Sequence, residues 1–264
     1  MLMARCWAHT LGGCDKMSGE HVISNAVFAA GCGCPVLIEG VARIRDGAPT
    51  ANAEKSNILC RLHNSMLSPL DAVVGRLANF QAASDDEDFS ETLYIDGELL
   101  ERWLLKTIIN FGAAGWMGPQ KLIPSSDVVS AIFGQMPLPA RIGLYSVNGI
   151  DPNHRPSGGV TMRPFFRTSP TMRELSGAYV AVHGLGLLAC LDDTLPLQID
   201  ASNASELFGN SQSEAFRLIY HPGAIVMDRK RGKPLIVGMS WGGLIRFKDG
   251  TTATLAQAHA GSSV

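Results

Sequence analysis

The sequence lacks a long uninterrupted hydrophobic run, and this absence argues against a membrane protein. Its most apolar stretch, residues 22–41, is broken by Asn25, Pro35 and Glu39. A transmembrane helix needs about 20 predominantly apolar residues, so this stretch does not qualify. The residues before Cys6 also lack the apolar core of a secretory signal. The sequence therefore predicts no membrane association and a cytoplasmic location.

The chain also lacks a strong excess of charge of either sign. With 22 Lys and Arg against 24 Asp and Glu, its formal net charge is −2, so the basic character typical of many nucleic-acid-binding proteins is missing. Between Lys121 and Arg173, however, basic residues outnumber acidic ones, which leaves room for a local basic surface. Neither a Walker phosphate-binding loop nor the glycine motif of dinucleotide-binding proteins is present.

Two short segments contain the residues with the clearest chemical pattern. Glu20 and His21 are adjacent in the first, and Asn57 and Asn64 bracket a Cys-x-x-His in the second. Carboxylate and amide oxygens are ligands that Mg²⁺ and Mn²⁺ prefer. Histidine titrates near neutral pH and can deprotonate water. These residues could therefore supply the parts of a metal-dependent site that hydrolyses phosphodiester bonds.

This ordered set resembles the HNH nucleases, a family with the ββα-metal fold. The resemblance implies that Glu20 and Asn64 bind a catalytic Mg²⁺ or Mn²⁺, that His21 is the general base, and that Asn57 braces the loop. Glu20 stands where Asp is commoner in the family, and Asn64 where His is commoner. His63 could instead replace Asn64 as the catalytic ligand. The implied activity is endonucleolytic cleavage of nucleic acid, which we expect to be DNA.

Many HNH domains also carry a structural zinc between two Cys/His pairs. By that resemblance the zinc ligands here would be Cys6, Cys14, Cys60 and His63. Two further cysteines, Cys32 and Cys34, could replace one of these pairs. The plainer alternative is a set of reduced, mostly buried thiols in a cytosolic protein.

Two other functions compete with the nuclease. A zinc module that keeps the fold but lacks catalysis would bind nucleic acid or a partner protein. The run Gly238–Gly242 matches the Gly-x-Ser-x-Gly elbow of serine hydrolases around Ser240. Only 22 residues follow it, and they offer Asp249 and His259 as partners in a polar tail. A glycine-rich turn explains this run better than an elbow does.

Several arginines could contact nucleic acid. They are Arg61, Arg163, Arg167, Arg229 and Arg231. The last two belong to a basic run expected at a hairpin tip, where solvated cations are common. Arg163 and Arg167 flank two phenylalanines, an arrangement found in single-strand binders but equally explained by burial of the aromatic rings.

The hydrophobic pattern predicts an α+β protein in two parts. Residues 1–82 would form the zinc-stabilised HNH-like module, whose last helix begins at Ser68, and residues 83–91 an acidic linker. Residues 92–264 would form a mainly antiparallel β domain through which the chain could also bind a partner protein or a second copy of itself. Its one long helix is predicted over 96–111, with Glu98, Arg102 and Lys106 on the polar face. Strands are predicted at 141–147, 175–182, 185–191, 215–220, 224–227 and 235–239.

Overall fold

A computed structural model describes residues 6–29, 55–83, 92–117, 122–148, 160–168, 173–182, 185–200, 203, 216–227, 235–247 and 249–261. The protein is a mixed α+β structure whose strand pairs are antiparallel with one exception among the described residues. The predicted class is therefore confirmed at this level. No helix in the described part of the chain is long and apolar enough to cross a membrane.

The N-terminal part is a strand pair followed by helices. Strand β1 (Met17–His21) pairs antiparallel with β2 (Lys55–Cys60), and a bulge interrupts the register between Ser18 and Glu20. Helix α2 (Arg61–Met66) follows β2 without a loop, and α3 (Ser68–Ala83) comes next. The short helices η2 (His9–Leu11) and α1 (Asn25–Ala29) flank β1.

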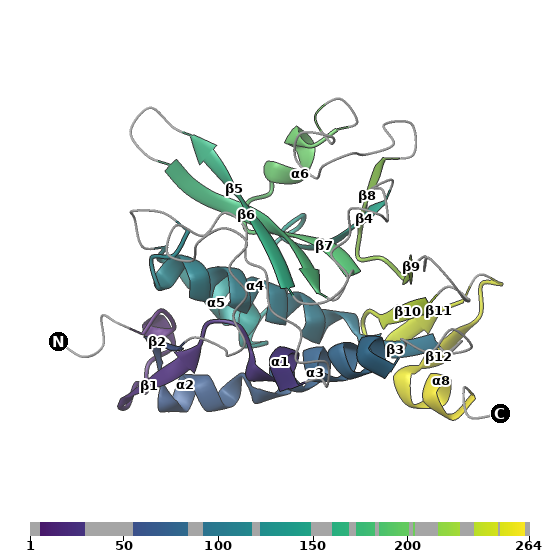
Figure 1. Ribbon diagram of the computed structural model, residues 1–264, viewed down its shortest axis with the longest axis horizontal. Coiled ribbons are helices and arrows are strands. Elements are labelled where there is room, and N and C mark those ends of the chain that lie inside the picture. Colours follow the sequence, from purple (N-terminus) through teal and green to yellow (C-terminus); the bar gives the residue numbers. More distant parts are fainter. Residues whose placement is uncertain are drawn as a thin grey trace.

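Helix α4 (Gly97–Ala113) is the centre of the molecule. Asp96 caps its N-terminus, with a carboxylate oxygen 3.0 Å from the backbone N–H of Leu99. In Figure 1 a sheet lies over one side of α4, whereas α3 and the β1–β2 pair lie on the other. Because both sides are covered, almost every residue of α4 is buried, from Leu100 to Ala113.

The sheet over α4 has five strands in the order β5-β6-β7-β4-β8. Their bounds are Gly143–Asn148 for β4, Val160–Thr168 for β5, Arg173–Val182 for β6, Leu185–Cys190 for β7 and Arg217–Tyr220 for β8. A three-stranded sheet, β3-β10-β9, contains the parallel pair, formed by β3 (Thr92–Asp96) and β10 (Leu235–Ser240), with β9 (Ala224–Met227) at its edge. The remaining elements are α5 (Ser126–Ile132), α6 (Leu195–Gln198), β11 (Leu244–Arg246), β12 (Thr252–Thr254) and α8 (Leu255–Gly261).

The predicted long helix and all six predicted strands are present within a few residues of their expected bounds. Strands β3, β5 and β12 were not predicted, and β12 lies in what was taken as a polar tail. Pairing of β3 with β10 is parallel and joins residues more than 140 positions apart, as in Ser240 with Asp96, so no local pattern indicates it. One buried hydrophobic cluster includes Leu59 and Leu77 from the N-terminal part together with Leu104 and Val180 from the remainder. The division at 83–91 stays a prediction, because those residues lie almost entirely outside the described ones.

Candidate metal centre and adjoining pocket

Three cysteines and one histidine converge beside the β1–β2 pair. The ligand atoms of Cys6, Cys14, Cys60 and His63 all lie within 4.8 Å of one another. The distance from His63 Nδ1 to the sulfur is 3.4 Å for Cys6, 3.6 Å for Cys14 and 3.2 Å for Cys60. This cluster could bind a metal ion such as zinc.

The distances can be compared with those expected around zinc. Bond lengths of about 2.3 Å to sulfur and about 2.0 Å to nitrogen, at a tetrahedral angle, separate the two ligand atoms by about 3.5 Å. The three observed nitrogen–sulfur distances fall close to that value. Three thiolates and an imidazole are also a soft ligand set suited to Zn²⁺. The side chains therefore fit a closed four-ligand site with no open position for chemistry.

The local sequence explains why these ligands meet. Cys60 ends β2 and caps α2, so its sulfur also lies 3.5 Å from the backbone N–H of His63 one turn later. The N-terminal segment is tied to the same place because Trp7 N–H donates to Ile58 O over 3.0 Å. Near Cys14, the backbone N–H of Arg61 donates to Lys16 O over 2.9 Å. These contacts bring Cys6 and Cys14 to the junction of β2 and α2.

The thiols of Cys6 and Cys14 hold their protons more firmly than free cysteine does, because their pKa values are raised. Burial raises the pKa of Cys6, and burial together with the neighbouring thiols raises the pKa of Cys14 to about 12. Burial lowers the pKa of His63 and favours its neutral form. A metal that binds here must therefore displace protons from the thiols but meets a histidine already suited to coordination.

A pocket of about 500 Å³ lies next to this cluster. Its wall includes Glu20 and His21 from β1, Arg61 and Asn64 from α2, and Asp71 from α3. The other lining residues are Ser18, Ser24, Asn25, Ala26, Ser65 and Ser68. The structure thus brings Glu20, His21 and Asn64 to one cavity. Asn57 is exposed on β2 and is not among the residues that line it.

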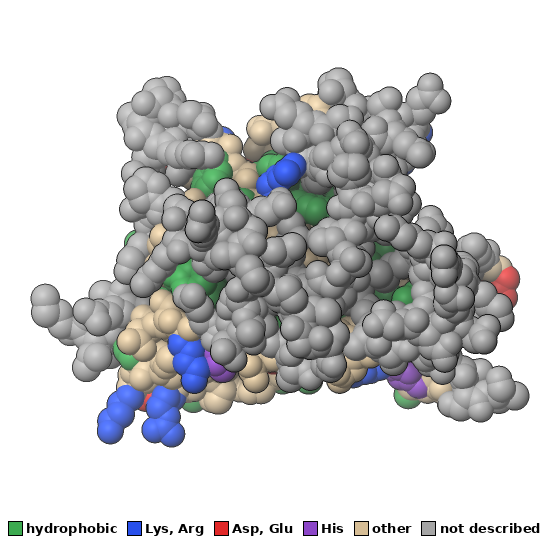
Figure 2. All heavy atoms as spheres, viewed as in Figure 1, with side chains coloured by type: hydrophobic (Ala, Val, Ile, Leu, Met, Phe, Trp, Pro, Cys, Tyr) green, Lys and Arg blue, Asp and Glu red, His purple; other side chains and the backbone are tan. Residues whose placement is uncertain are grey.

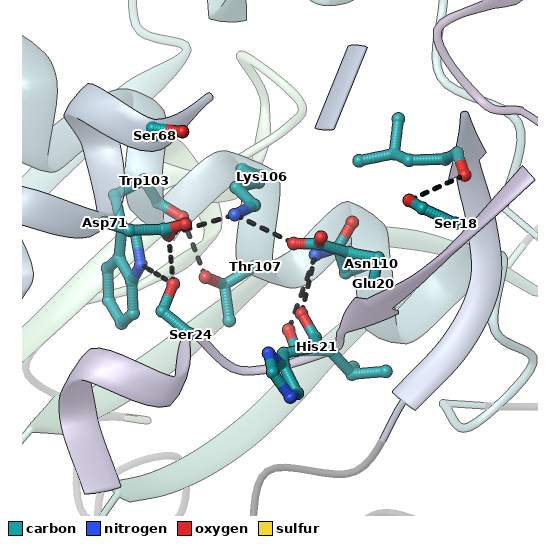
Figure 3. A network of polar contacts seen from close by, with 12 residues as sticks. Ser18, Glu20, His21, Ser24, Ser68, Asp71, Trp103, Lys106, Thr107 and Asn110 are labelled. Atoms are coloured by element: carbon teal, nitrogen blue, oxygen red, sulfur yellow. Dashed lines mark hydrogen bonds and ion pairs between the residues drawn. The ribbon is translucent and has the colours of Figure 1, made fainter. Parts of the chain in front are cut away.

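Glu20 is buried at the base of the pocket, where it meets a lysine from α4. Its Oε1 lies 2.9 Å from Lys106 Nζ, and Nζ also lies 3.0 Å from Asp71 Oδ1. Figure 3 shows the ammonium between the two carboxylates. Burial raises the pKa of the Glu20 carboxyl, and the ammonium of Lys106 opposes that rise.

His21 lies beside this network and is partly exposed to the pocket. Burial lowers its pKa, and the positive charges of Lys55 and Lys106 lower it further, against the opposing effect of Asp71. The imidazole is therefore held in its neutral form near neutral pH, as a general base must be.

Helix α4 also braces the backbone that carries these side chains. Asn110 lies within 3.5 Å of the carbonyl oxygens of His21 and Val22, and its Oδ1 accepts a hydrogen bond from Trp7 Nε1 over 3.0 Å. Trp103 Nε1 donates to Ser24 Oγ over 2.7 Å, and Ser24 donates onward to Asp71 Oδ1 (Figure 3). The end of β1 is thereby fixed against α4.

The arginines proposed as nucleic-acid contacts are placed differently from one another. Arg61 is exposed at the pocket, whereas Arg167 pairs with Glu174 over 2.7 Å and Asp192 over 2.9 Å on the sheet. Arg163 is half-buried on β5. Arg229 and Arg231 lie outside the described residues, as do Cys32 and Cys34.

The residues of the hydrolase-like run do not meet as a catalytic set. Ser240 is buried at the end of β10, and its hydroxyl lies 3.4 Å from Ile95 O. His259 Nε2 lies 2.9 Å from Arg76, and the carboxylate of Asp249 accepts from Thr251. A two-residue turn and β11 follow β10 where an elbow would need a helix.

Sequence reasoning missed Asp71, which lines the pocket, and also Lys106 and Asn110, which contact residues of its lining. Lys106 was assigned to the polar, solvated face of its helix, yet it is 1% exposed. The assignment was wrong because α4 is covered on both sides, so a polar residue there faces another element and not water. A signal was available: Lys106 and Asn110 are one turn apart in residues 103–113, where Thr107 is the only other polar side chain.

Comparisons of the whole chain with protein-family models, with curated proteins and with solved structures gave no match.

Proposed function

We propose that this protein is a metal-dependent endonuclease of the HNH type that hydrolyses phosphodiester bonds in DNA. The observation that supports the proposal is that Glu20 and His21 line one pocket together with Asn64, which lies more than 40 residues later in the chain. They do so on a strand–strand–helix unit, in the order that the resemblance to HNH nucleases requires. A carboxylate, a neutral imidazole and an amide oxygen in one cavity are the groups that such a reaction uses.

Each residue has a distinct role in the proposed reaction. His21 takes a proton from the attacking water at a ring nitrogen, because its surroundings keep it neutral. Glu20 and Asn64 would hold a divalent cation through oxygen atoms, and one oxygen of Glu20 is already committed to Lys106. Mg²⁺ or Mn²⁺, when bound, supplies positive charge that stabilises the scissile phosphate and the leaving oxygen.

Zinc at the cluster of Cys6, Cys14, Cys60 and His63 would have a structural role. Its four ligands leave no position for water or substrate. His63 and Asn64 are adjacent on α2, so an ion held by His63 would also fix the helix that carries Asn64. In this proposal His63 belongs to the zinc site, and Asn64 is the ligand in the catalytic pocket.

The surface around the pocket suits a polyanion despite the net charge of the chain. Lys and Arg side chains gather at the corner formed by β1, β2 and α2 (Figure 2). Three cations here are exposed: Lys16 directly precedes β1, Lys55 begins β2 and Arg61 begins α2, and Arg61 lines the pocket itself. Phosphates on either side of the scissile bond would meet these cations.

The experiment is a plasmid-nicking assay with Mg²⁺ or Mn²⁺ on the full chain and on His21→Ala. We expect nicking by the wild type only when the divalent cation is added. Loss of the base should lower the rate by about 100-fold or more, with the melting temperature and zinc content unchanged. His259→Ala is the matched control, because that histidine lies on α8 away from the pocket and should leave the rate unchanged.

Two results would contradict the proposal. Full activity of His21→Ala would remove His21 from the mechanism. A wild-type protein that binds DNA but never nicks it with either cation would favour the non-catalytic module. The ion pair between Glu20 and Lys106 agrees with that alternative, because it occupies an oxygen that a metal ion would use.

A further inference from the structure

The buried ammonium of Lys106 has no role in the reaction described above. Its side chain is 1% exposed, and the two carboxylates that it contacts, Glu20 and Asp71, are 5% and 34% exposed. Burying an ammonium is costly unless ion pairs and hydrogen bonds compensate, so this lysine is fixed by both partners together. Three separate elements, β1, α3 and α4, are joined at this point.

Asp71 is held in place by Lys106 and by Ser24. Both hydrogen bonds that it accepts from described residues, from Lys106 and from Ser24, end on Oδ1. The hydroxyl of Ser24 accepts from Trp103 Nε1 and so directs its own proton to Asp71. Asp71 is therefore an ordered carboxylate on the pocket wall and not a mobile surface group.

Two carboxylates that face a common point, one of them in the wall and one at the base of a polar pocket, form the kind of place that a divalent cation occupies. Here the point is filled by Lys106 Nζ, at 2.9 Å from Glu20 and 3.0 Å from Asp71. An ammonium supplies one positive charge and offers no open coordination position for water or phosphate, so it cannot do the work of Mg²⁺.

We propose that Lys106 is a positioning residue. Its ammonium occupies the position between the carboxylates of Glu20 and Asp71 where a divalent cation would otherwise bind. It thereby excludes a divalent ion from the position between these two carboxylates. This inference rests on the proposed nuclease function. It gives α4 a role at the pocket through contacts with two lining residues, although the sequence resemblance covers only the N-terminal part of the chain.

Lys106→Met tests the inference, since methionine keeps the length of the side chain and removes the charge. Two uncompensated carboxylates would then attract a divalent ion into the place that the lysine had filled. We expect the dissociation constant for Mn²⁺, measured by electron paramagnetic resonance on full-length protein without DNA, to fall by at least tenfold. The nicking rate at saturating Mn²⁺ should fall by at least tenfold because the ion is held in the wrong place. Lys106→Arg should return both quantities to within about threefold of the wild type.

Arg76→Met is the matched control. Arg76 is exposed on the same helix as Asp71, contacts Tyr94 O and His259, and takes no part in the ion pairs of Glu20 and Asp71, so Mn²⁺ affinity should stay within about threefold. A purely structural role for Lys106 would lower the melting temperature of Lys106→Met without tightening Mn²⁺ binding. Unchanged or weaker Mn²⁺ binding by a folded Lys106→Met would overturn the inference.

A second variant keeps the test valid if Lys106→Met does not fold. In Asp71→Asn, Lys106 keeps its ion pair with Glu20. We expect the Mn²⁺ affinity to stay within about threefold of the wild type, because in this proposal Asp71 does not bind the catalytic ion. A tenfold loss in that variant would make Asp71 itself a ligand and would also overturn the inference. Failure of the wild type to nick DNA would instead contradict the proposed function, since the Mn²⁺ measurements need no nuclease activity.

Discussion

His21 lies in surroundings that favour its neutral form, and this has a consequence at the scale of the residue. Burial and the charges of Lys55 and Lys106 lower its pKa, while Asp71 acts in the opposite direction. A base whose pKa is lowered stays unprotonated to a lower pH than ordinary histidine, which titrates near 6.5. The resemblance to HNH nucleases implied that His21 is the base, but nothing in the sequence indicated the lysines that lower its pKa.

The pH dependence of nicking follows from this shift. Because the proposed base must be neutral, the rate should be constant above its pKa and fall as the pH drops below it. We expect the acid limb of the pH–rate profile at saturating Mn²⁺ to lie below 6.5. Lys55→Met should move this limb toward higher pH, and the displacement should shrink at high salt because Lys55 is exposed. An acid limb above 6.5 would contradict the prediction.

At the scale of elements, the four residues of the candidate metal cluster meet at the junction of β2 and α2. Helix α2 has six residues, too few to be stable without tertiary contacts. Cys60 and His63 lie at its start, while Cys6 and Cys14 bring the N-terminal segment to the same point. The spacing of Cys60 and His63 made this pair predictable. Its partners were chosen by family resemblance, and their meeting depends on backbone hydrogen bonds such as Trp7 to Ile58 that no motif records.

Removing the metal should therefore destabilise the protein and abolish nicking. A ligand present at a thousandfold above its Kd stabilises the folded state by about 4 kcal/mol, and such a loss lowers Tm by about 10 °C in a protein of this size. We expect this fall after zinc chelation and in Cys14→Ser, with zinc content measured by mass spectrometry. Cys190→Ser is the control, because Cys190 is a buried thiol of a different hydrophobic cluster and should leave zinc content unchanged. An unaltered melting curve after complete zinc removal would refute a structural role for the cluster.

At the scale of the whole molecule, what the sequence predicted and what it missed have one physical cause. Local patterns predicted α4, α3 and most strands, since hydrophobic periodicity and helix caps act within a few residues. The β3–β10 pairing and the ion pairs of Lys106 join distant segments, and a single sequence does not specify such partners. The same limit made residues 92–264 look separate from the pocket, although Trp103, Lys106 and Asn110 contact its residues directly.

A fragment of residues 1–91 tests how far the N-terminal part is an independent module. Without α4, Glu20 loses its ammonium, Ser24 loses Trp103, and the apolar side of α3 that packs on α4 is exposed to water. We therefore expect no cooperative melting transition for this fragment, even with zinc added, and no nicking. Co-expression with residues 92–264 should restore both if the two pieces assemble, because the shared core then re-forms. A cooperative transition and metal-dependent nicking by residues 1–91 alone would instead establish an autonomous nuclease module and make α4 dispensable for the pocket.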